Sequence, residues 1–69
     1  MAKLNYDRDV KGIEKSVNTD YQKLCNKEVK VHEGIDKWEL WIGGENTYIG
    51  TLREVYCQLL GMSRVLKNM

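Results

Sequence analysis

The residues best suited to chemistry in this chain are its single histidine, His32, and its two cysteines, Cys25 and Cys57. His32 has no accompanying set of serine, cysteine and carboxylate typical of nucleophilic or acid–base catalysis, so we expect a solvated strand position for it. The two cysteines form no CxxC pair, and both fall within helical apolar patterns, where a thiol behaves as a small hydrophobic group. We therefore expect two reduced thiols, as in cytosolic proteins, and no metal site.

Four acidic residues near the middle of the chain are the next candidates: Glu33, Asp36, Glu39 and Glu45. Their spacing is not that of a calcium-binding loop. We expect so small a domain to have no pocket that excludes water from a catalytic pair of carboxyl groups. The pair Gly43-Gly44 lacks the following Lys-Ser/Thr and the βαβ context of a phosphate-binding loop. We therefore predict no catalytic residue, no cofactor and no small-molecule substrate.

Length and charge limit the remaining functions. A chain of 69 residues forms a single small domain, 1–69, whose modest core makes self-association a natural aid to stability. The formal net charge is +1, with an acidic middle between two mildly basic flanks, which is too little for a protein that binds nucleic acid over its whole surface. With no signal-like leader and no apolar run long enough to cross a bilayer, the expected location is the cytoplasm and no membrane contact is predicted.

The elements that would position these residues follow from periodicity. Residues 37–42 alternate between apolar and mainly polar positions, residues 28–32 do the same, and residues 48–49 follow a glycine-rich turn. This pattern predicts a three-stranded antiparallel meander. The class expected is α+β: an N-terminal helix, the meander, and a C-terminal helix with a short helical tail.

The N-terminal helix is expected from an apolar stripe with helical spacing between Tyr6 and Leu24. A break near Asn18, with Asn18 or Thr19 capping a second helix, is an open alternative, because residues 16–19 have low helix propensity. The mixed charges beside the stripe, including Glu14, are expected to form a solvated surface.

The C-terminal helix is expected to begin at a Thr51 cap and to end at Gly61. Residues 51–64 then resemble the first helix and turn of a helix-turn-helix. A small residue, Cys57, lies four before Gly61, and Ser63 is placed to cap the following helix. Together with the preceding hairpin, residues 38–66 resemble the repeat module of intron-encoded homing endonucleases, which small phage and mobile-element proteins reuse.

The resemblance implies a small phage or mobile-element regulator that contacts DNA, with Arg53, Ser63, Arg64 and Lys67 as the contacts. The match departs from the pattern at Lys67, which occupies a position where a second core residue is expected. A recognition helix here would therefore present few side chains.

The alternative is a protein-binding module, such as a phage-type modulator of a host or phage protein. Trp38 and Trp41 are three apart on one strand, so their rings project to opposite faces. We expect Trp38 to face the core and Trp41 to stay partly exposed; covering of Trp41 by the N-terminal helix is an equal alternative. Tyr48 on the neighbouring strand could pair with either ring. The contact surface would be the exposed sheet face with Trp41 and Tyr48, or the basic N-terminal helix. For either function we expect a homodimer.

Overall fold

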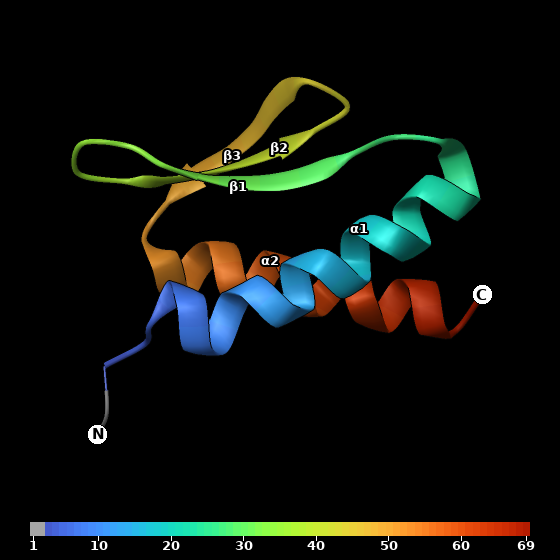
Figure 1. Ribbon diagram of the computed structural model, residues 1–69, viewed down its shortest axis with the longest axis horizontal. Helices are drawn as coiled ribbons and strands as arrows, with labels where there is room; N and C mark the ends of the chain where they lie inside the picture. The colour runs from blue at the N-terminus through green and yellow to red at the C-terminus, as the bar shows by residue number, and fades with distance from the viewer. Residues whose placement is uncertain (1–2) are drawn as a thin grey trace.

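A computed structural model describes residues 3–69 and contains two helices packed under a small antiparallel sheet (Figure 1). Its elements, in chain order, are η1 (Tyr6–Val10, one turn of π-helix), α1 (Lys11–Cys25), β1 (Val29–Glu33), β2 (Trp38–Ile42), β3 (Glu45–Gly50) and α2 (Leu52–Lys67). The predicted α+β class is confirmed, with the helices on one face of the sheet.

The sheet is the predicted meander, with the strand order β1-β2-β3. Val31 lies opposite Leu40 between β1 and β2, and Leu40 lies opposite Tyr48 between β2 and β3. A bulge shifts the register of β3 beyond Leu40, and the turn before it uses Gly43 and Gly44 with φ of 62° and 82°. Glycine adopts positive φ with no steric cost from a Cβ atom, so these two residues favour the β2–β3 hairpin.

The core lies between the inner face of the sheet and the two helices. Its buried members are all aliphatic: Val10, Val17, Val29, Leu40, Val55 and Leu59. They come from η1 and α1, from β1 and β2, and from α2, so one cluster joins the helices to the sheet. Burial of this surface is the main driving force for folding.

Helix α1 is continuous through Asn18, so the alternative break is not formed. The side chain of Asn18 does not cap a helix; its Oδ1 accepts a hydrogen bond from the backbone N–H of Val29, at 2.8 Å. Glu14, one turn earlier, accepts hydrogen bonds from the Val31 N–H and from the Tyr6 hydroxyl. The expectation that Glu14 belongs to a solvated surface was therefore wrong, because α1 lies along the edge of β1.

Helix α2 is also continuous, and the predicted end at Gly61 was wrong. Gly61 does not have the positive φ of a helix-terminating glycine. The helix continues because Met62 and Leu66 extend the apolar stripe of Leu59 and pack against the core. No helix within residues 3–69 has both the length and the apolar content needed to span a membrane.

The start of α2 is fixed as predicted by Thr51. Its side chain accepts a hydrogen bond from the Glu54 N–H, and the Glu54 carboxylate accepts one from the Thr51 N–H, which completes a capping box. The Glu54 carboxylate also accepts a hydrogen bond from the Tyr48 hydroxyl, at 3.1 Å. The hydrogen bond from the Thr51 backbone, followed by that from Tyr48, lowers the pKa of Glu54 below its ordinary value.

Candidate functional site

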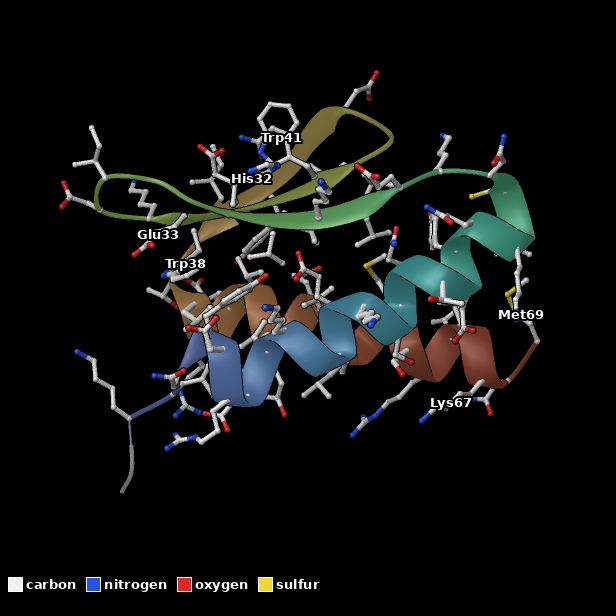
Figure 2. All side chains as sticks on the ribbon, in the orientation of Figure 1. His32, Glu33, Trp38, Trp41, Lys67 and Met69 are labelled. Atoms are coloured by element: carbon white, nitrogen blue, oxygen red, sulfur yellow. The ribbon has the colours of Figure 1, made fainter. Side chains whose placement is uncertain are left out.

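The outer face of the sheet, which we call the Trp41 face, is turned away from both helices. Cross-strand pairing places Trp41 between Lys30 and Asn46, and Glu39 between His32 and Ile49. Successive strand residues point to opposite faces, so these six residues lie opposite Val31 and Leu40 of the core face. Figure 2 shows Trp41 and His32 above the sheet, with both helices below it.

Trp41 is half-buried, and its ring is held by neighbours on the same face. The indole Nε1–H donates a hydrogen bond to Glu39 Oε1 at 2.9 Å. His32 meets the indole edge to face, with ring centroids 5.5 Å apart and an interplanar angle of 74°. These contacts restrict the indole before any partner binds, which lowers the entropy cost of using it in an interface.

Trp38 has the opposite role, and this assignment is confirmed. It packs against the core cluster on the inner face, where Tyr6 stacks on it with a centroid separation of 5.2 Å. The strand therefore directs Trp38 toward the core and Trp41 toward the outer surface of the sheet, as expected from their spacing.

Tyr48 does not join the Trp41 face, so its predicted place beside Trp41 on a contact surface was wrong. It lies opposite Leu40 on the inner face, packs against the core, and donates its hydroxyl hydrogen to Glu54 of α2. The bulge in β3 leaves Asn46 and Ile49 as the residues of that strand on the outer face, where Ile49 is 53% exposed.

The predicted DNA contacts lie on α2. Arg53, Arg64 and Lys67 are exposed, and Figure 2 shows Lys67 below the helical layer on the side away from the sheet. Arg53 and Arg64 are eleven residues apart, close to three helical turns, so they share one face. Ser63 is half-buried inside the continuous helix and caps nothing, which corrects its predicted role.

Sequence reasoning missed several members of the Trp41 face, namely Lys30, His32 and Ile49 as neighbours of Trp41. The alternation of the strands was a usable signal for their face, but not for the register between strands. The β1–β2 register places Lys30 and His32 opposite Trp41 and Glu39, and the bulge in β3 sets the position of Ile49. Among the described residues, no group of three or more histidine, cysteine or acidic side chains is placed to hold a metal ion.

Comparisons with protein-family models, with curated proteins and with solved structures found no match to this chain. Two surfaces of the molecule therefore indicate its function: the Trp41 face, and the exposed basic side chains Arg53, Arg64 and Lys67 of α2.

Proposed function

We propose that this chain is a non-enzymatic protein-binding module that uses the Trp41 face as its contact surface. The observation that carries the proposal is the position of Trp41: a large aromatic side chain, ordered by Glu39 and His32, on a sheet face that neither helix covers. Tryptophan is enriched among the residues that contribute most to protein interfaces.

The chemistry around Trp41 indicates the kind of partner. Ile49 extends the apolar area, while Lys30 and Glu39 place one charge of each sign beside it. An apolar centre with a mixed polar rim is typical of protein–protein interfaces, whereas a phosphate-rich partner would require a basic surface. The partner expected is a protein with a small apolar patch bordered by both acidic and basic groups.

Replacing Trp41 with alanine is expected to weaken binding of the partner by about 30-fold, because it removes the central aromatic contact of the interface. The partner can be found by comparing cross-linked proteins captured from cells by the wild-type chain and by Trp41→Ala. Its affinity for both purified forms is then measured by calorimetry, in low and in moderate salt.

The matched control is Ile35→Ala. Ile35 is fully exposed at the β1–β2 turn, away from Trp41, so its removal tests whether any exposed apolar side chain produces the effect. Capture lost with Trp41→Ala and retained with Ile35→Ala supports the proposal. Identical protein sets from all three baits would refute it.

A second candidate function, DNA contact through α2, is favoured by one observation. The continuous helix places Arg53 and Arg64 on one exposed face, with Lys67 one turn beyond Arg64. These groups could contact phosphates from the side of the helical layer opposite the sheet. This arrangement replaces the helix-turn-helix mode, since the turn is not formed.

If α2 contacts DNA through these three residues, the affinity for duplex DNA should fall with salt with a log–log slope of about −2.7. The Arg53→Ala/Arg64→Ala/Lys67→Ala variant should abolish that dependence, while Lys37→Ala, on the sheet side, should leave it unchanged. Fluorescence anisotropy with labelled duplexes measures both. An absence of binding at low salt would exclude this candidate and leave the Trp41 face.

A further inference from the structure

The two edge strands of the sheet, β1 and β3, differ in what bonds their outward backbone groups. At the β1 edge, the outward N–H groups of Val29 and Val31 donate to Asn18 and Glu14 of α1. Side-chain acceptors thus replace a neighbouring strand, and the edge is closed to further pairing.

The β3 edge has no such cover within residues 3–69. The Val31 N–H points away from β2, so Leu40, which lies opposite Val31, directs its backbone groups toward Tyr48 of β3. The backbone N–H and C=O of the next residue, Ile49, therefore point away from the sheet. No described side chain or backbone group bonds them. The bulge of β3 lies before Tyr48, so the Tyr48–Ile49 segment follows it. The strand contains no proline or lysine, residues that commonly protect an edge, and its single charge is Glu45 at the start.

Apolar surface continues below this edge. An open groove of about 670 Å³ lies between the inner side of β2 and β3, the end of α1 at Tyr21 and Leu24, and α2 from Cys57 onward. Its lining includes Ile42 and Tyr48 from the sheet, and Met62 and Val65 from α2, and Val65 is 62% exposed. A strand added to β3 would extend the roof of this groove and remove apolar surface from water.

We infer that the open edge of β3 pairs with β3 of a second copy, antiparallel about a two-fold axis, to form a continuous six-stranded sheet. The β1 edge is already bonded by α1, so β3 is the edge that a second copy can offer. Antiparallel pairing of identical strands satisfies the outward groups of both copies at once, as an isologous interface requires.

Charge also favours a second copy over a foreign strand. In an antiparallel pair, the two Glu45 side chains lie at opposite ends of the paired segment, so they do not repel each other across it. Residues 46–49 are neutral, so they offer no charge that would favour a partner strand of opposite charge over a second copy. The pairing also adds to a sheet and a core that are small for independent stability.

Sedimentation velocity across concentrations tests the pairing. Wild type is expected to dimerise, and Ile49→Lys and Ile49→Pro are expected to weaken the dimer at least tenfold. Lysine places a charge on the paired edge, while proline removes the outward N–H. The matched control Ile35→Lys introduces the same charge at the fully exposed turn residue and should leave the dimer unchanged.

Hydrogen exchange of the Ile49 amide gives a direct second measurement. It should be protected at concentrations where the dimer forms and exchange rapidly on dilution, whereas Trp41→Ala should leave this protection intact. A monomer at about 1 mM would overturn the inference. So would a dimer that both Ile49 variants leave intact, or one in which this amide stays unprotected. None of these outcomes depends on the partner proposed for Trp41.

Discussion

Leu59→Ala is expected to lower the free energy of unfolding by about 3 kcal/mol, which is the typical cost of truncating a fully buried leucine. Leu59 has no exposed surface and lies in the cluster that joins α2 to the sheet and to α1. A domain of this length has roughly 3–10 kcal/mol of total stability. Chemical denaturation followed by circular dichroism should therefore show a large shift of the midpoint, with a substantial unfolded population in the absence of denaturant.

The neighbouring Leu60 provides the matched control. It is half-buried and lies outside the core cluster, so Leu60→Ala makes the same chemical change on another side of the same helix. We expect it to cost less than about 1 kcal/mol, since little buried surface is lost. Equal losses for the two variants would contradict the description of the core.

Local patterns were sufficient for the elements that depend on near neighbours. Alternation along 37–42 predicted β2 and the opposite faces of Trp38 and Trp41, and the capping residue Thr51 predicted the start of α2. These features are set within a few residues by strand geometry and by a capping box, so the sequence alone contains the necessary information.

The end of α2 required tertiary information. Gly61 has low helix propensity, and in isolation it favours the turn that we predicted there. The packing of Met62 and Leu66 against the core outweighs this preference of about 1 kcal/mol, and the helix continues. Because the helix is continuous, Ser63 caps no second helix, and the exposed basic residues of α2 all lie on one helix.

The β1 edge could not be predicted for a different reason. Glu14 and Asn18 are four residues apart, on the flank of the apolar stripe of α1, which is the signal that could have identified them. On sequence alone such a pair resembles any solvated helix flank. Only the packing of α1 along β1 makes them acceptors for strand N–H groups.

Replacing Glu14 with glutamine is expected to lower the free energy of unfolding by about 2 kcal/mol. The Glu14 carboxylate accepts hydrogen bonds from two donors, the Val31 N–H and the Tyr6 hydroxyl. Glutamine keeps the size but is neutral: its oxygen can accept from the Val31 N–H and its NH₂ group can donate to the Tyr6 oxygen, so both hydrogen bonds remain but lose their charged acceptor. A hydrogen bond to a charged group contributes about 1 kcal/mol more than a neutral one, and two such bonds are affected. The control Glu28→Gln alters an exposed carboxylate, 3.9 Å from the Lys30 ammonium, and should change stability by less than about 0.5 kcal/mol.

Tyr6 provides a second, independent measurement of the same contact. Burial, followed by the hydrogen bond to Glu14 and its charge, raises the pKa of Tyr6 above the ordinary value of 10.0. Since the folded-state pKa is raised, the stabilisation is complete below about pH 10 and is lost as pH rises beyond it. In Glu14→Gln the pKa of Tyr6 should fall toward its ordinary value but remain above it, because burial persists. Ultraviolet titration against a Tyr6→Phe reference measures this change, and an unaltered Tyr6 titration in Glu14→Gln would show that Glu14 does not hold the hydroxyl.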